Sequence, residues 1–387
     1  MTVRWVLLAA MMLPLLGCGK SAIHFMREGG PVAQAPKVEQ AVTLRKLWRR
    51  DLGRGYQNSN FLLTPSLQGD RLYAAEPEGR VYALDAQSGK ILWKQDLDEA
   101  LAAGVGADAR QVLVATREGE VFSLDAENGE TRWRQKMGTE ILARPVLTEK
   151  QVLLRSGDGQ VIGADLDSGS ILWRVRRSVP ALTVRGLSAP LIIDNVALIG
   201  FASGRLSGID VESGAELWSA RIFRARGSNE VNRLVDIDSD PYQMGDRLII
   251  AGFQAQISAL SLKTRRIEWD SDHSTLRPLS SVGDTLLVTT DDGSVSGLDI
   301  RTGSQLWEVG ALRGRGVSGP LGLGQNGLTV VGDYKGLLYL IDAASGQLVG
   351  RQKGAGGAVL GIYGAGNGDG FITLSENGSL TAWSVVE

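Results

Sequence analysis

The sequence predicts an all-β protein: an eight-bladed β-propeller of four-stranded antiparallel blades with Trp-docking repeats, its ring closed by an N-terminal strand. Three observations predict it. One motif recurs about every 40 residues, each repeat holds several strand-like runs, and a lone Trp strand opens the chain. Self-similarity at this period with strand-like content is typical of propellers and related arrays.

The repeated motif ends one apolar run with Asp, places Gly four residues later, and reaches Trp eight residues after the Asp. The clearest copies span residues 81–93, 121–133, 161–173, 206–218 and 295–307. Two further copies depart from the rule. Ser261 and Arg265 replace the Asp and Gly that precede Trp269, and Gly350 stands where a Trp is due.

Within a repeat, residues such as Val81 and Ala83 alternate with other side chains, which suits one face of a pleated strand. The Asp can hydrogen-bond the backbone of the turn, and the Gly supplies a positive φ. A third apolar run precedes each motif, as at residues 111–116, and a short run near Pro145 gives a fourth strand. Because an isolated hairpin is marginally stable, these units must stack as blades.

The blade count follows from the Trp positions. Eight positions fit, namely Trp48, Trp93, Trp133, Trp173, Trp218, Trp269, Trp307 and the vacant Gly350. The chain opens with a Trp strand at residues 44–51 and closes with a repeat that lacks this strand. The N-terminal strand is therefore expected to complete the last blade and close the ring. We interpret the repeat Trp, Asp and Gly residues as core and turn residues, none of them catalytic.

The N-terminal residues indicate export. Arg4 precedes an apolar run that ends in Leu15-Leu16-Gly17-Cys18, which resembles a bacterial lipobox, and Cys18 is the single cysteine of the chain. We expect a signal peptide at residues 1–17, a lipidated Cys18 with a flexible tether at 18–42, and the propeller at 43–387. A chance cysteine in a simple signal peptide is the alternative.

The residue after the lipobox cysteine indicates where the product is sorted. Gly19, rather than Asp, favours the periplasmic face of the outer membrane of a Gram-negative bacterium, with membrane contact through the lipid anchor alone.

The formal net charge of −2 and the pI of about 5.9 give no indication of nucleic-acid binding.

Two consecutive connections between blades are longer than most others. The spacing from Trp173 to Pro190 is 17 residues and that from Trp218 to Pro241 is 23, whereas other connections measure 9 to 13. A third, before Pro65, is also 17 residues but belongs to the other side of the ring. The two neighbours should adjoin on one face. Their arginines and apolar residues, opposite an acidic run, suit a protein interface. The alternative is that the Arg and Asp groups merely pair with each other.

Catalytic and metal-binding groups are scarce. The chain has two histidines, His24 and His273, which disfavours a histidine metal site or a Ser-His-Asp triad. The alternating acids at 236–240 do not form a complete calcium loop, because Pro241 and Arg247 occupy the places of its Gly and Glu. We expect no metal, no cofactor and no enzyme activity.

Two other functions are open alternatives. Eight-bladed propellers with Trp repeats resemble quinoprotein dehydrogenases that bind pyrroloquinoline quinone, but the chain lacks their vicinal cysteine pair. A generic periplasmic protein-binding propeller is the second alternative.

The lipobox, the tether and the eight Trp-docked blades together resemble the BamB family, lipoproteins of the outer-membrane β-barrel assembly (BAM) machinery. Residues 182–190 are similar to that family's Leu-x-Leu-Arg-Gly-x-Ser-Ala-Pro, and 229–238 are similar to its Glu-Ile-Asp-Arg-Leu-x-Asp-Val-Asp. Val184 replaces a Leu and Asn232 replaces an acid.

The resemblance implies a non-catalytic scaffold that docks on a periplasmic POTRA domain of BamA and assists folding and insertion of β-barrel proteins. Other BAM subunits are implied partners, and unfolded outer-membrane proteins are candidate clients. The contact residues that the resemblance implies are Leu182, Val184, Arg185, Asp236 and Asp238.

Overall fold

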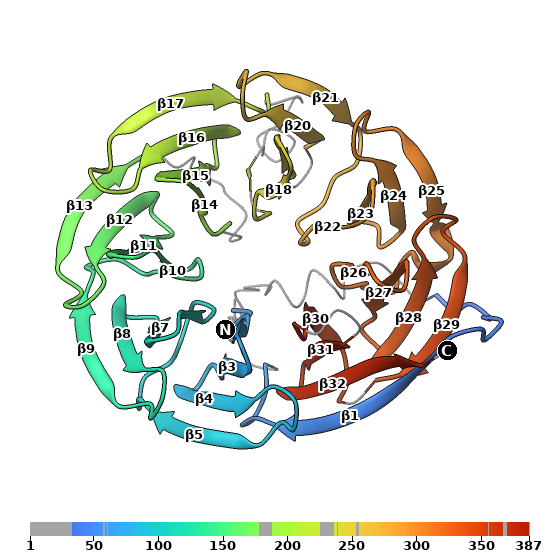
Figure 1. Ribbon diagram of the computed structural model, residues 1–387, viewed down its shortest axis with the longest axis horizontal. Helices are drawn as coiled ribbons and strands as arrows, with labels where there is room; N and C mark the ends of the chain where they lie inside the picture. Colours follow the sequence, from blue (N-terminus) through green and yellow to red (C-terminus); the bar gives the residue numbers. More distant parts are fainter. Residues whose placement is uncertain are drawn as a thin grey trace, which may run out of the picture.

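Eight sheets, each of four antiparallel strands, stand radially around a central axis (Figure 1). The structure is a computed structural model of the chain, and it describes residues 33–56, 59, 61–177, 188–224, 236–237, 239–252, 255–354, 356–366 and 370–386. The fold predicted from the sequence is thereby confirmed. In the described part of the chain, no helix is long and apolar enough to cross a membrane.

The first four blades follow the chain order. Blade 1 contains β2 (Ser66–Gln68), β3 (Arg71–Ala75), β4 (Arg80–Asp85) and β5 (Ile91–Asp96). Blade 2 contains β6 (Gly106–Ala107), β7 (Gln111–Ala115), β8 (Glu120–Asp125) and β9 (Thr131–Lys136). Blade 3 contains β10 (Val146–Leu147), β11 (Gln151–Arg155), β12 (Gln160–Asp165) and β13 (Ile171–Arg176). Blade 4 contains β14 (Leu191–Ile193), β15 (Val196–Gly200), β16 (Arg205–Asp210) and β17 (Glu216–Arg221).

The remaining blades repeat this order until the ring closes. Blade 5 contains β18 (Tyr242–Met244), β19 (Arg247–Ile250), β20 (Ile257–Ser261) and β21 (Ile267–Ser271). Blade 6 contains β22 (Ser280–Val282), β23 (Thr285–Thr289), β24 (Val295–Asp299) and β25 (Gln305–Val309), followed by the short 3-10 helix η2 (Gly310–Leu312). Blade 7 contains β26 (Leu321–Leu323), β27 (Leu328–Gly332), β28 (Leu337–Asp342) and β29 (Leu348–Lys353).

Blade 8 joins the two ends of the chain. Its order is β1 (Thr43–Asp51), β32 (Ser379–Val386), β31 (Gly370–Ser375) and β30 (Val359–Gly364), from outside to inside. The first and last strands pair from Thr43 opposite Val386 to Asp51 opposite Ser379. The N-terminal strand therefore closes the ring, as the sequence predicted.

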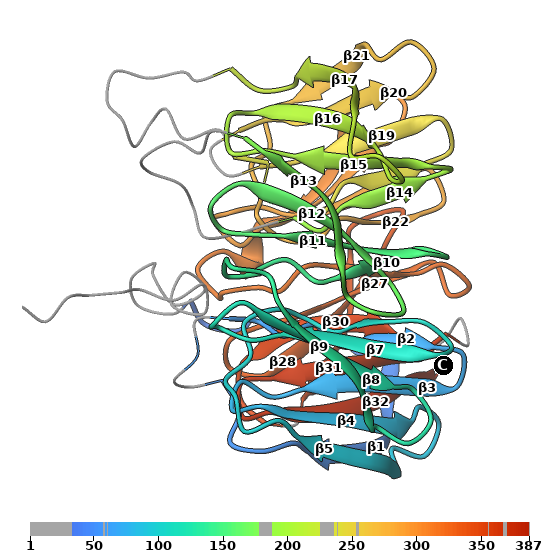
Figure 2. The ribbon, with the colours of Figure 1, turned by 90° about the vertical axis from the view of Figure 1, so that its left-hand side faces the viewer.

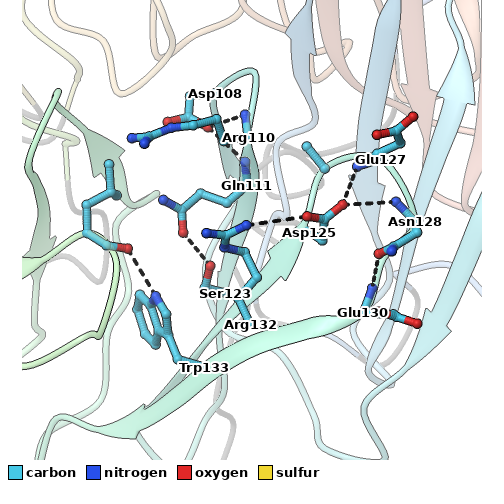
Figure 3. A network of polar contacts seen from close by, with 12 residues as sticks. Asp108, Arg110, Gln111, Ser123, Asp125, Glu127, Asn128, Glu130, Arg132 and Trp133 are labelled. Carbon is cyan, nitrogen blue, oxygen red and sulfur yellow. Dashed lines mark hydrogen bonds and ion pairs between the residues drawn. The ribbon is translucent and has the colours of Figure 1, made fainter.

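In six blades the repeated Trp fastens the outer strand to the following blade. In blade 2 the Trp133 Nε1–H donates to the Leu166 carbonyl at 3.0 Å (Figure 3). The ring also lies against the turn glycine, since a Cβ added to Gly169 would come within 2.6 Å of it. Trp48, Trp93, Trp173, Trp269 and Trp307 donate to the next blade in the same way.

The Asp of each repeat organises the turn before the Trp strand. In Figure 3 the Asp125 Oδ1 accepts hydrogen bonds from the backbone N–H groups of Glu127 and Asn128, at 2.9 and 3.2 Å. Gly129 completes the turn at φ +78°. In the degraded copy, Arg265 adopts φ +56° in the glycine's place, and its guanidinium lies 5.4 Å from the centre of the Trp218 ring.

The missing Trp at Gly350 has a structural cause. Blade 8 is completed by two separate chain ends, so it lacks the Asp-to-Gly turn on which a Trp of blade 7 would dock. The segment leading into β1 covers this place instead. The Ala41 and Val42 N–H groups donate to the Val349 carbonyl at 2.9 and 3.0 Å. A Cβ on Gly350 would lie 2.5 Å from the Val42 oxygen, so a side chain there is excluded.

The strand order gives the ring two different faces. Strands within a blade are antiparallel, so the turns between second and third strands lie at the same face as the connections between blades. We call this the connection face; it is the left-hand side of Figure 2. The Asp-to-Gly turns lie on the opposite, turn face.

Candidate protein-binding site

The two long connections leave neighbouring blades at the connection face. The first joins β13 to β14 and the second joins β17 to β18. Residues 178–187, 225–235 and 238 lie outside the described part of the chain. The predicted contact residues Leu182, Val184, Arg185 and Asp238, and the predicted lipidation site Cys18, are therefore not placed by the structure. What the structure places is the base of each connection.

The bases of the two connections are hydrogen-bonded to each other. The Ala189 N–H donates to the Asp240 Oδ1 at 2.6 Å, and the Ser188 hydroxyl donates to the Ile237 carbonyl at 3.2 Å. Residues about 50 positions apart in the sequence thus meet directly at one point of the connection face. The two connections emerge side by side, as expected from their positions in neighbouring blades.

A buried arginine holds the first connection against blade 3. Arg155 ends β11 and is 3% exposed. Its Nη1 donates to the Ser188 carbonyl at 2.8 Å and to the Ser188 hydroxyl at 2.7 Å. The guanidinium carbon also lies 5.5 Å from the centre of the Phe201 ring in blade 4. Hydrogen bonds from a charged donor are stronger than neutral ones, so Arg155 fixes the path of the chain at Ser188.

Two glycines, one in blade 4 and one in blade 5, make room for the base of the second connection. Ile237 is fully buried, and a Cβ on Gly200 would lie 2.2 Å from its Cγ2 atom. A Cβ on Gly252 would lie 2.1 Å from the Asp236 carbonyl oxygen. Only glycine permits the backbone to approach this closely. The base of the second connection is therefore packed between blades 4 and 5.

Asp236 belongs to this packed base. Its side chain is 1% exposed, so in the free protein it faces the interior. The burial of Asp236 could not be inferred from the acidic run at 236–240, whose alternation suggests exposed carboxylates.

The described arginines at the end of β13 and the start of the first connection do not neutralise the acids of the second. Arg177 pairs with Glu216 at 2.9 Å, and Arg176 lies 3.5 Å from the Asp158 carboxylate. The Arg174 Nη2 donates to the Met137 carbonyl at 2.8 Å. These three side chains are therefore engaged with blades 2, 3 and 4, and not with the acidic run of the second connection.

The sequence analysis did not single out Arg155, which holds the first connection against blade 3. Arg155 carried a signal, because the equivalent strand ends in the neighbouring blades are Ala115 and Gly200. A charged residue at such a buried position indicates a specific partner. Among the described residues, no group of three or more His, Cys, Asp or Glu side chains could hold a metal ion.

Comparison with known proteins identifies a family over nearly the whole chain. The family model described as outer membrane protein assembly factor BamB matches residues 39–102, 77–308 and 291–385. The chain is 42% identical over 353 residues to the outer membrane protein assembly factor BamB of Pseudomonas aeruginosa, covering 91% of each chain. It is 30% identical over 363 residues to that of Escherichia coli K12, covering 91% of this chain and 92% of the other.

Solved structures give the same result for the fold. BamB from Moraxella catarrhalis superposes with a TM-score of 0.80 at 28% identity, covering 88% of this chain and all of that one. The quinohemoprotein alcohol dehydrogenase ADHIIG from Pseudomonas putida superposes with a TM-score of 0.70 over 88% of this chain and 76% of its own. Its 12% identity shows a shared fold alone.

Proposed function

The chain belongs to the BamB family of outer membrane protein assembly factors, and from that premise we propose that it is a scaffold that binds a periplasmic POTRA domain of BamA. It is an assembly factor and not an enzyme, since its relatives are named for assembly and the dehydrogenases share only the fold. The remaining question is which surface makes the contact.

One observation carries the proposed surface: the two long connections are hydrogen-bonded together at their bases on the connection face. Two segments fixed side by side can present one continuous surface to a partner. Leu182 and Val184 would supply apolar anchors, and Arg185 and Asp238 would supply charges of both signs. Buried apolar and arginine side chains dominate the binding energy of most protein interfaces. Asp236 would act by holding the second connection in shape.

The proposed lipid anchor would be joined to the ring at the connection face. We propose that Cys18 is the lipidated residue and that the ring lies at the periplasmic side of the outer membrane. The buried Arg315 follows β25 at the connection face, and its guanidinium donates a hydrogen bond to the Ala33 carbonyl. The chain therefore reaches the ring from the connection face. About 15 residues separate Cys18 from Ala33, a reach of up to about 50 Å.

A titration tests the proposed contact. The full chain in detergent is titrated with the POTRA domains of BamA from the same organism, alongside Leu182→Ala and Arg185→Ala. If these residues are central to the interface, each change should weaken binding by about 2 kcal/mol, or about thirtyfold. Arg132→Ala is the matched control, because Arg132 lies on the outer strand of blade 2 and pairs with Asp125 on the turn face.

The variants must unfold at the temperature of the parent chain for the comparison to hold. Binding that both folded variants retain would refute the proposed residues. Absence of any binding by the parent chain would refute the proposed partner.

A further inference from the structure

A polar groove lies at the connection face between the outer parts of blades 5 and 6. Its cavity volume is about 310 Å³, and it is lined by the end of blade 5, the turn between β23 and β24, the outer strand β25 and the residue Arg313. Four carboxylates line it, those of Asp272, Asp291, Asp292 and Glu308. This groove is distinct from the two long connections and lies one blade further round the ring.

Two of the four carboxylates are satisfied by a guanidinium of the chain itself. The Arg313 Nε donates to the Asp292 Oδ2 at 2.7 Å, and its Nη2 donates to Glu308. Although burial alone would raise the pKa of Asp292, hydrogen bonds from Thr290, Ser294 and Arg313 lower it to about 2. Asp292 is therefore a carboxylate at every physiological pH.

The other two carboxylates, those of Asp272 and Asp291, form no ion pair among the described residues. Asp272 accepts a hydrogen bond from the Gln256 amide at 3.0 Å through Oδ1, and Asp291 accepts one from the Ser274 hydroxyl through Oδ2. The Arg277 guanidinium, whose pKa burial lowers and the nearby Asp291 and Asp292 raise, donates to the carbonyls of Val317 and Thr290 and not to a carboxylate. Even with Arg277 counted beside the lining Arg313, four carboxylates outnumber two guanidinium groups, and the groove keeps an excess of negative charge.

The buried Ser296 hydroxyl, which lines the groove, has no hydrogen-bond partner among the described residues. Ser296 belongs to β24 and is 1% exposed. The equivalent Ser258 in blade 5 donates to the Asp270 carboxylate opposite it, at 2.5 Å. In blade 6 the residue opposite is Glu308, which Arg313 holds instead. A buried unsatisfied polar atom is costly, so a group from outside is expected to meet it.

We propose that this groove binds an arginine side chain of a protein that docks on the connection face. A guanidinium carries five N–H donors in one plane, which matches several acceptors spread around one cavity. Asp272, Asp291 and the Ser296 hydroxyl are such acceptors. A metal ion fits less well, because no group of three ligating side chains that could hold one occurs among the described residues. The groove would thereby extend the contact beyond the two long connections.

The chain provides its own reporter for this site. Its histidines are His24 and His273, so a histidine-ring NMR spectrum contains the signals of two rings. His273 lines the groove, and its Nε2 lies 3.0 Å from the Gln305 Oε1. The full chain in detergent is titrated with Nα-acetyl-arginine methylamide. Nα-acetyl-citrulline methylamide serves as the uncharged isostere.

The arginine probe should shift the His273 signal saturably and leave His24 unchanged, while the citrulline probe should shift neither. Asp291→Asn should weaken the apparent affinity by about tenfold, since a hydrogen bond to a charged group contributes about 1.5 kcal/mol or more. Asp270→Asn is the control, because it removes a carboxylate of blade 5 that does not line the groove. It should leave the affinity unchanged.

Equal shifts with both probes, no shift with either, or an arginine response that survives Asp291→Asn would each overturn the proposal. Because the probe is a small molecule, the result is independent of whether the chain binds BamA.

Discussion

The two faces of the ring are built differently. On the turn face six blades repeat an Asp-to-Gly turn and receive a Trp N–H from the preceding blade, as Trp93, Trp133 and Trp307 show. On the connection face the contacts are individual, such as Arg155 with Ser188 in one junction and Arg315 with Asp333 in another. Repetition holds the ring together, and the departures from it create surfaces that can recognise a partner.

The largest effect that would test this contrast comes from removing a docking Trp. Trp133→Ala should lower the free energy of unfolding by about 3–5 kcal/mol, because it leaves a cavity between blades 2 and 3 and an unpaired Leu166 carbonyl. At a temperature where the variant is folded, its binding to a partner should be unchanged. Chemical denaturation and the titration described above measure the two quantities. A loss of binding by the folded variant would show that the faces are not independent.

A change at the connection face should have the opposite pattern. Gly200→Ala would place a Cβ 2.2 Å from Ile237, which must move and carry the second connection with it. We expect a loss of stability of about 1–3 kcal/mol, and partner binding weakened more than stability alone explains.

Gly324→Ala is the matched control for this change, since a Cβ there meets nothing within 4 Å. It should alter neither quantity. Normal binding by Gly200→Ala would show that the packed base does not shape the site.

The smallest effect is a pH dependence of the turn face. Hydrogen bonds from Ser88, Ser168 and Ser213 hold the pKa values of Asp85, Asp165 and Asp210 below their ordinary range. A depressed carboxyl pKa contributes stability that is fully present above the unfolded value of about 3.9 and is lost as pH falls through the folded value. The melting temperature should therefore decline below about pH 4. A profile that stays flat down to pH 2 would contradict this account of the turns.

Most of the fold could be predicted because the same motif recurs about every 40 residues. The eight Trp positions gave the number of blades, and the unmatched strand around Trp48 gave the closure. The reason for Gly350 could not be predicted, since it depends on where residues 41–42 cross blade 7. The family-specific residues of the two long connections were visible in the sequence, whereas their support by Arg155, Gly200 and Gly252 depends on contacts between blades.

Hydrogen exchange of the backbone amides, with and without the POTRA domains of BamA, tests the central claim most directly. We predict that binding protects residues 178–187 and 225–238 and leaves the turns on the opposite face, such as 125–129, unchanged. Protection confined to the turn face or to the outer strands would contradict the assignment of the connection face as the site of partner binding.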